Sequence, residues 1–267
     1  MALRPAAGFR LKTRLLTVVL ELALPVGVVA AWWLLSSRST SVFFPPLSEI
    51  ATAFRQTWLF ARWNTDAIPS PDNLALGFLI SCVLGIGLGV FLGLAPVVAD
   101  AIAPVLEFLR AVPGVALLPA AILLLGIGPQ TRVSLIAFGT IWPILMNTID
   151  GVRAIDPMIR DVTRSYQIRG PGWLWRIVLP AASPQIVAGL RTALSIGITV
   201  MVFSEFTGTT NGIGFQILTA ERAFAVPQMW AGMILLGIIG YLLNVAFRGF
   251  EHIVLRWHRG MRQLARS

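Results

Sequence analysis

The chain has 267 residues, of which 56% are hydrophobic and only 12% are charged. A soluble domain carries about twice that charged fraction, so the composition excludes a soluble globular protein and indicates an integral membrane protein. The length leaves room for about six spans of about 20 residues joined by short loops, and for no sizeable soluble domain.

The formal net charge of +9 could suggest a nucleic-acid partner. The arginines cluster at the ends of apolar runs, however, where they orient a membrane protein, so we expect no nucleic acid. The only cysteine is Cys82 and the only histidines are His252 and His258, too few for an intrachain disulfide or a metal cluster.

Residues 1–14 carry four basic side chains and no acid, and an apolar run follows from Leu15 to Leu35. This pattern also fits a signal peptide, but the run has spanning length and ends on the interfacial pair Trp32-Trp33. We therefore expect a first span. Glu21 within it is costly in a membrane and should face protein or a water path.

Residues 36–70 are polar and predict an extracytoplasmic segment. Pro45-Pro46 precedes Ser48, which is expected to cap a short surface helix that ends near Trp58. Residues 1–70 thus form one region, made of the N-terminal tail, the first span and this helix.

The second predicted span runs from about residue 73 to 94 and carries a stripe of small residues. Four residues turn a helix by about 400°, so a four-residue repeat drifts only about 40° per step. The stripe should let a neighbouring helix approach closely, as static packing or as a rocking surface, and packing is the favoured interpretation. Its members are Gly77, Ser81, Gly85, Gly89 and Gly93.

The third span, about 103–126, is interrupted by Pro113-Gly114 and Pro119. Broken backbone in a membrane is tolerated where it is buried in protein or lines a cavity. The fourth span, about 131–149, contains Asn147.

A long polar stretch from 156 to 189 follows, with Arg160, Arg164, Arg169 and Arg176. A loop this rich in arginine is expected on the cytoplasmic side. Its apolar residues fall at helical spacings, which predicts a short amphipathic helix that docks a soluble partner. The alternative is an ordinary loop that only sets the topology.

This stretch resembles the signature loop of the permease subunits of bacterial ABC importers, Glu-Ala-Ala, a Gly four residues later, then Ile-x-Leu-Pro. Asp161-Val162-Thr163 stand at the Glu-Ala-Ala positions and Ile177-Val178-Leu179-Pro180 match the end. The continuation from Pro184 resembles the sulfonate/nitrate/taurine branch. Asp161 replaces Glu and Gln167 replaces Gly, and the nearby Gly170 and Gly172 are expected to supply the turn instead.

The resemblance covers about residues 70–258. It implies that the loop is a coupling helix inserted into a groove of an ATPase subunit. The implied coupling residues are Asp161, Val162, Thr163, Arg164, Tyr166, Gln167, Ile168, Gly170, Leu179 and Pro180.

The fifth span is predicted from about 184 to 206. A Gly- and Thr-rich outside loop follows, with a helix around 215–224, and the sixth span runs from about 229 to 248. Polar groups of the third to fifth spans are the candidates for a translocation path, although Ser and Thr in spans often bond only to their own backbone. These candidates are Pro113, Asn147, Ser195, Thr199 and Glu205.

With six spans and both termini inside, 15 basic residues lie inside and 5 outside, Arg191 excluded. The expected fold is an all-α membrane protein with the type I ABC importer permease architecture. Its core is 71–250 with the coupling loop 151–180, and 251–267 form a basic cytoplasmic tail.

The sequence has no Gly-x-x-x-x-Gly-Lys-Ser/Thr motif and no convincing catalytic set. We therefore expect a permease that is not itself an enzyme and binds no cofactor, with ATP and Mg held by a partner ATPase.

The resemblance implies a bacterial inner-membrane importer of a small solute, such as an organic or inorganic anion. Its expected partners are a second permease copy, two ATP-binding subunits, an extracytoplasmic substrate-binding protein and membrane lipid. The rival hypothesis is a carrier or channel driven by an ion gradient, which predicts more buried charge in the spans. A structural scaffold would leave the broken third span and the loop without purpose.

Overall fold

The computed structural model describes residues 23–257 except 25, 38, 40 and 208. Within that part of the chain every regular element is helical. The first is an unlabelled apolar helix, Val26–Ser36. The others are α2 (Leu47–Phe54), η1 (Arg55–Ala61), η2 (Trp63–Ala67), α3 (Pro69–Leu94), α4 (Pro96–Ala111), η3 (Gly114–Leu117), α5 (Leu118–Leu125), α6 (Pro129–Arg153), α7 (Pro157–Ser165), α8 (Pro171–Trp173), η4 (Leu174–Val178), α9 (Leu179–Thr207), α10 (Ile213–Arg222) and α11 (Val226–Val254).

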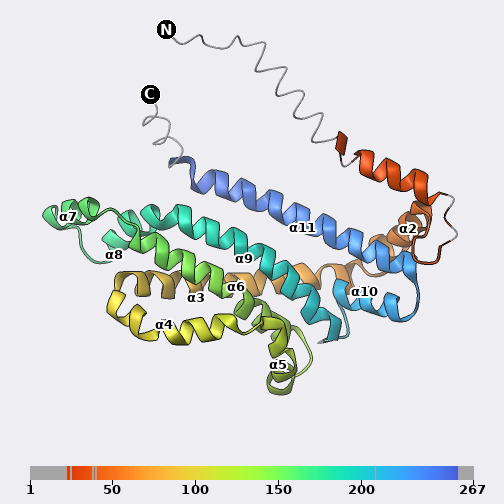
Figure 1. Cartoon of the computed structure of the whole chain (residues 1–267), viewed down its shortest axis with the longest axis horizontal. Coiled ribbons are helices and arrows are strands. Elements are labelled where there is room, and N and C mark those ends of the chain that lie inside the picture. The colour runs from red at the N-terminus through yellow and green to blue at the C-terminus, as the bar shows by residue number, and fades with distance from the viewer. Residues whose placement is uncertain (1–22, 25, 38, 40, 208, 258–267) are drawn as a thin grey trace, which may run out of the picture.

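Three long helices form the centre of the molecule, with α6 packed between α3 and α9. Figure 1 shows α11 running along the same direction, with α7 and α8 at one end of the bundle and α2 and α10 at the other. Each end has its own apolar core: Val152, Val178 and Ala182 lie at the α7 end, and Ile50 and Ile213 lie at the α10 end. The two ends of the bundle are therefore separate regions, each packed around its own apolar core.

Four helical segments are long and apolar enough to cross a membrane, namely 63–94, 129–153, 171–207 and 226–254. They confirm the second, fourth, fifth and sixth predicted spans, each somewhat longer than predicted. Proline lacks an N–H that would need a partner in the first helical turn, so Pro129 and Pro171 open their segments earlier than the apolar pattern suggests. The segment 63–94 is longer because η2 precedes α3.

The third predicted span is two helices and not one. Segments 96–111 and 114–125 meet at a bend of 80°, so this part of the chain is a broken span or a re-entrant loop. Pro113 lies in the bend with extended φ and ψ of −61° and 121°, because a proline removes a backbone donor and disfavours helix in the residue before it.

The first part of the first predicted span, with Glu21, lies outside the described residues, and the rest of the span includes the apolar helix 26–36. The surface helix predicted from Ser48 begins one residue earlier. Pro46 occupies the cap position without a side-chain hydrogen bond, so the prediction that Ser48 is the cap was wrong. The carbonyl of Ser48 instead accepts a hydrogen bond from the Thr52 hydroxyl inside the helix.

The small-residue stripe of α3 faces α6. A Cβ atom at Gly89 would lie 2.5 Å from Thr148 Cβ, and one at Gly93 would lie 2.6 Å from Val152 Cβ. Gly77 and Gly85 meet Ile136 and Ile144 of α6 in the same way. The two backbones approach so closely that no larger residue fits without a shift.

Ser81 completes the stripe with a polar contact. Its hydroxyl lies 2.6 Å from the Thr140 hydroxyl and donates to the Ala137 carbonyl of α6 at 2.7 Å. The α3–α6 contact is therefore fixed in register by a buried hydrogen bond as well as by shape.

Candidate functional site

The end of the bundle that carries α7 is built by local sequence signals. Asp156 caps α7, its carboxylate accepting from the Met158 amide at 2.8 Å, and Pro157 occupies the first helical position. The Arg160 guanidinium donates to the Val152 carbonyl at the end of α6 at 3.1 Å, and Thr163 is buried. The helix is thus held to the core by one side.

The C-terminal end of α7 forms a Schellman motif. The Ile168 amide donates to the Thr163 carbonyl and the Gln167 amide to the Arg164 carbonyl, both at 3.0 Å. This motif needs a left-handed residue after the cap, and Gln167 adopts it with φ of 54°. The position at which the resembling family has Gly therefore keeps the glycine conformation although the residue is Gln.

The sequence analysis assigned that turn to Gly170 and Gly172. Only Gly170 among the two has a positive φ, of 65°, and it opens α8. The chain therefore turns twice, once at Gln167 and once at Gly170, where the sequence predicted a single glycine turn.

The side of α7 away from the core is apolar and uncovered in the single chain. Met158 is 70% exposed, Tyr166 77% and Val162 48%. Large apolar side chains gathered on a short helix that projects from a bundle indicate a docking surface. We call Met158, Val162 and Tyr166 the docking face.

The predicted coupling residues lie together on this segment. Thr163 is buried, and Leu179 and Pro180 are half-buried at the start of α9. The remaining ones are exposed: Asp161, Val162, Arg164, Tyr166, Gln167, Ile168 and Gly170.

The five candidates for a translocation path do not form one site. Ser195 and Thr199 share an exposed face of α9, where each hydroxyl donates to the carbonyl four residues earlier. Asn147 donates to the Pro143 carbonyl of its own helix and lies against Gly189 of α9. Pro113 is exposed at the bend of the third segment.

Glu205, the fifth candidate, is wholly buried at the α10 end of the bundle. One carboxylate oxygen accepts from the Gly214 amide at 2.8 Å, and the other lies 3.6 Å from the guanidinium of Arg132, which is 2% exposed. Arg132, which lies at the start of the fourth predicted span and is one of the five basic residues counted as outside, is therefore a buried member of α6.

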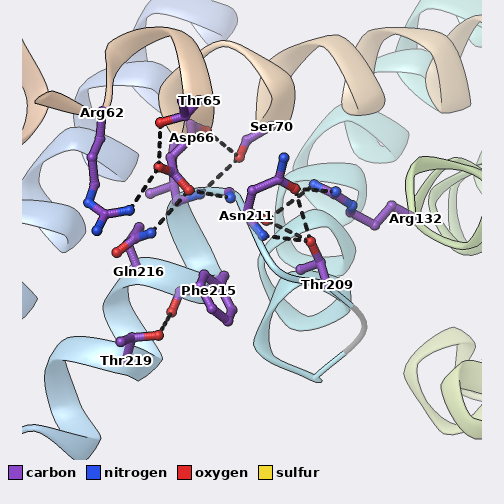
Figure 2. A network of polar contacts seen from close by, with 12 residues as sticks. Arg62, Thr65, Asp66, Ser70, Arg132, Thr209, Asn211, Phe215, Gln216 and Thr219 are labelled. Carbon is purple, nitrogen blue, oxygen red and sulfur yellow. Dashed lines mark hydrogen bonds and ion pairs between the residues drawn. The ribbon is translucent and has the colours of Figure 1, made fainter. Parts of the chain in front are cut away.

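A second acid that sequence reasoning missed, Asp66, belongs to the same region, as Figure 2 shows. Its carboxylate accepts from the Gly212 amide at 2.9 Å, from the Gln216 amide at 3.1 Å and from the Thr65 hydroxyl at 2.8 Å. Arg62 pairs with it at 3.3 Å. Asp66 thus ties the start of α3 to the start of α10.

Asn211 lies between the surroundings of Glu205 and those of Asp66. Its side-chain oxygen accepts from Arg132 at 2.6 Å and from the Thr209 hydroxyl at 3.1 Å. Gly212 beside it has φ of 118°, and a Cβ there would lie 2.6 Å from the Glu205 carboxyl carbon. Glycine is therefore required at this position by backbone conformation and by space.

A sequence signal for this network existed. Arg132 opens the fourth predicted span and Glu205 ends the fifth, so antiparallel spans bring opposite charges to the same membrane level, where buried charges are expected to pair. Asp66 gave no such signal, because Gly212 and Gln216, the partners that connect it to α10, lie about 150 residues away in the chain.

Arg191, whose role the sequence left open, pairs with Glu251 of α11 at 3.6 Å and is about half exposed. In the described ranges, no three His, Cys, Asp or Glu side chains come together as a metal site.

The chain is similar to a family model, to several known permease sequences and to a solved structure. The family model described as binding-protein-dependent transport system inner membrane component matches residues 85–259. The taurine transport system permease protein of Escherichia coli is 27% identical over 249 residues, covering 89% of this chain and 90% of its own. The nitrate import permease protein of a Synechocystis species is 31% identical over 186 residues, covering 70% and 68%.

A bicarbonate transport system permease protein of Synechococcus elongatus is 28% identical and covers 95% of both chains. Among solved structures, the MetNI methionine ABC transporter in inward-facing conformations matches with a TM-score of 0.61 at 19% identity. That match covers 71% of this chain and 94% of the other, and it shows a shared fold.

Proposed function

The chain belongs to the family of binding-protein-dependent transport system inner membrane components, as the permease subunit of an ABC importer, and from this premise we propose that it imports a small anion. The relatives named above carry taurine, which is a sulfonate, nitrate and bicarbonate. These substrates have in common a small oxyanion group.

The observation that carries the proposed mechanism is the docking face on α7. Met158, Val162 and Tyr166 are exposed, whereas the opposite side of the helix is anchored to α6 through Arg160 and Val152. When a partner bound to this face moves, it also moves the end of α6. Since α6 packs between α3 and α9, these two helices move with it. ATP-driven closure of two ATPase subunits, which hold the ATP and Mg, would thus shift the spans between two states.

The exposed face of α9 supports a path between two copies of this chain. Ser195 and Thr199 lie on it, with Thr192 one turn earlier. Because α6 packs against α3 and α9 and leaves this face of α9 exposed, we propose a homodimer whose facing α9 surfaces line the path. An extracytoplasmic binding protein then supplies most of the selectivity.

The proposed topology has six spans with both termini in the cytoplasm. The bent segments 96–111 and 114–125 count together as the third span. This arrangement puts α7 and the tail on the cytoplasmic side, and the Asp66–Glu205 network on the outer side.

The test is reconstitution of the permease with its ATPase subunits and binding protein in liposomes. Labelled taurine, nitrate and bicarbonate are offered separately, with and without internal ATP. We expect ATP-dependent uptake of one of them by the wild type. The variant with Asp161, Tyr166 and Ile168 changed to Ala should lose both uptake and co-purification of the ATPase.

A matched control changes three exposed apolar residues far from α7, Leu123, Leu124 and Ile127, to Ala. This control should retain the ATPase subunit. Uptake by the permease alone without ATP would instead support a gradient-driven carrier and overturn the proposal, and equal uptake by the α7 variant would overturn the coupling role.

A further inference from the structure

A cavity of about 650 Å³ lies between α7, the loop after it and the end of α3, and three arginines line it: Arg160, Arg164 and Arg169. Among the described residues, no ion pair involves any of the three. The Nε donor of Arg160 is buried and has no hydrogen-bond partner there. Three guanidinium groups without a carboxylate attract an anion. We call this hollow the arginine cavity.

A second hollow, of about 370 Å³, lies against the outer side of α3. Its walls are almost wholly apolar and include Val83, Gly87 and Val90 of α3 and Leu174 and Trp175 of η4. We call it the apolar groove. It opens on the side of α3 opposite to α6, which in a permease is available to lipid.

The two hollows are lined by neighbouring residues of the same two segments. Leu94 and Trp173 line the arginine cavity, whereas Val90 and Leu174 line the apolar groove. Val90 and Leu94 are one turn apart on α3, which is about 6 Å along the helix. A molecule with an anionic head and an apolar chain would therefore fit across both.

The docking face Met158, Val162 and Tyr166 does not line this cavity, although four of the predicted coupling residues do, namely Thr163, Arg164, Ile168 and Gly170. On α7, Arg160 follows Met158 by two residues and Arg164 follows Val162 by two, a rotation of about 200° in each pair. The arginine row and the Met158–Val162 row therefore lie on opposite sides of the helix. A protein partner that binds the Met158–Val162 row therefore leaves the arginine row facing the end of α3.

We propose that an anionic phospholipid occupies both hollows, with its phosphate in the arginine cavity and one acyl chain in the apolar groove. Basic pockets at the cytoplasmic ends of spans recognise such headgroups. The bound lipid would join α7 to α3 and stabilise the coupling segment. The inference needs the membrane location of the chain and does not rest on the proposed substrate.

The experiment measures phosphatidylglycerol retained by the purified full-length chain, by native mass spectrometry, with phosphatidylcholine as the neutral comparison. We expect selective retention of phosphatidylglycerol. Changing both Arg164 and Arg169 to Gln should weaken it roughly thirtyfold, since each basic residue near an anionic lipid surface contributes roughly fivefold. Arg160 is left intact because it also holds the Val152 carbonyl.

The control with the same charge change alters Arg176 and Arg248 to Gln, both outside the cavity, and should retain the lipid. The groove is tested by Gly87→Leu, because Gly87 lines it and a Cβ there meets nothing within 4 Å. It should lower retention several-fold. Gly237→Leu on α11, which is equally open, should not.

Soluble glycerol phosphate distinguishes a lipid from a free anion. If it displaces phosphatidylglycerol at equal concentration, the site takes small phosphates and the proposal is wrong. Unchanged lipid retention in the Arg164/Arg169 variant overturns it as well. In that case, loss of the ATPase subunit from the same variant would assign these arginines to the protein partner.

Discussion

Arg132 and Glu205 join α6 and α9 by an ion pair of 3.6 Å in which both side chains are almost completely buried. The Gly214 amide donates to Glu205 and the Asn211 side-chain oxygen accepts from Arg132, while Arg132 Nε and Glu205 Oε1 have no hydrogen-bond partner among the described residues. The pair therefore links two spanning helices to the segment that leads into α10, and it makes this end of the bundle a rigid unit.

The first prediction concerns that pair. Arg132→Gln leaves the Glu205 carboxylate buried without its counter-charge, and it should cost about 3–5 kcal/mol of stability. Thermal unfolding of the purified permease in detergent is the measurement. Arg191→Gln, which breaks the exposed pair with Glu251, serves as control and should cost less than about 1 kcal/mol. Equal losses in both variants would contradict the special role of the buried pair.

The second prediction compares two glycines of α3 that lie two residues apart. Gly89→Leu places its side chain into Thr148 of α6, whereas Gly87→Leu meets open space. Overpacking of this kind costs at least about 1–3 kcal/mol, so Gly89→Leu should unfold at a lower temperature than the wild type. Gly87→Leu should unfold as the wild type does, and the reverse order would show that α3 faces α6 differently.

The third prediction concerns the end of α7. Gln167 holds a left-handed conformation that costs a residue with a Cβ about 1–2 kcal/mol. Gln167→Gly should therefore stabilise the Schellman motif by about 1 kcal/mol and slow amide hydrogen exchange at Ile168. Gly170→Ala, at the other position of this segment with a positive φ, should destabilise the segment and make that exchange faster. Faster exchange in Gln167→Gly would argue that the Gln side chain itself holds the turn.

The fourth prediction tests whether the exposed face of α9 is wet. With Cys82 changed to Ser, Thr199→Cys should react with a charged, membrane-impermeant thiol reagent in the assembled transporter. Val245→Cys on α11, also exposed in the single chain, should react far more slowly because it faces lipid. Reaction needs the thiolate and therefore water. An unreactive Thr199→Cys would remove this face from the translocation path.

The sequence by itself determined the features that repeat locally along the chain. Apolar runs of spanning length located the four helical segments that are long and apolar enough to cross a membrane. Prolines marked the break near Pro113, and the four-residue repeat marked the small face of α3. The signature ending Leu179-Pro180 and the arginines of the loop located the α7 segment and pointed to the family.

Only the tertiary structure decided which distant groups meet. Asp66, Arg132, Glu205 and Gly212 are spread over about 150 residues, and their contacts depend on which helices are neighbours and at what height. The left-handed turn at Gln167 was equally hidden, because the residue type argues against that conformation. Both features follow from burial and packing of the whole bundle, which no local pattern encodes. A buried charge must find a partner, and a helix end must satisfy its carbonyls.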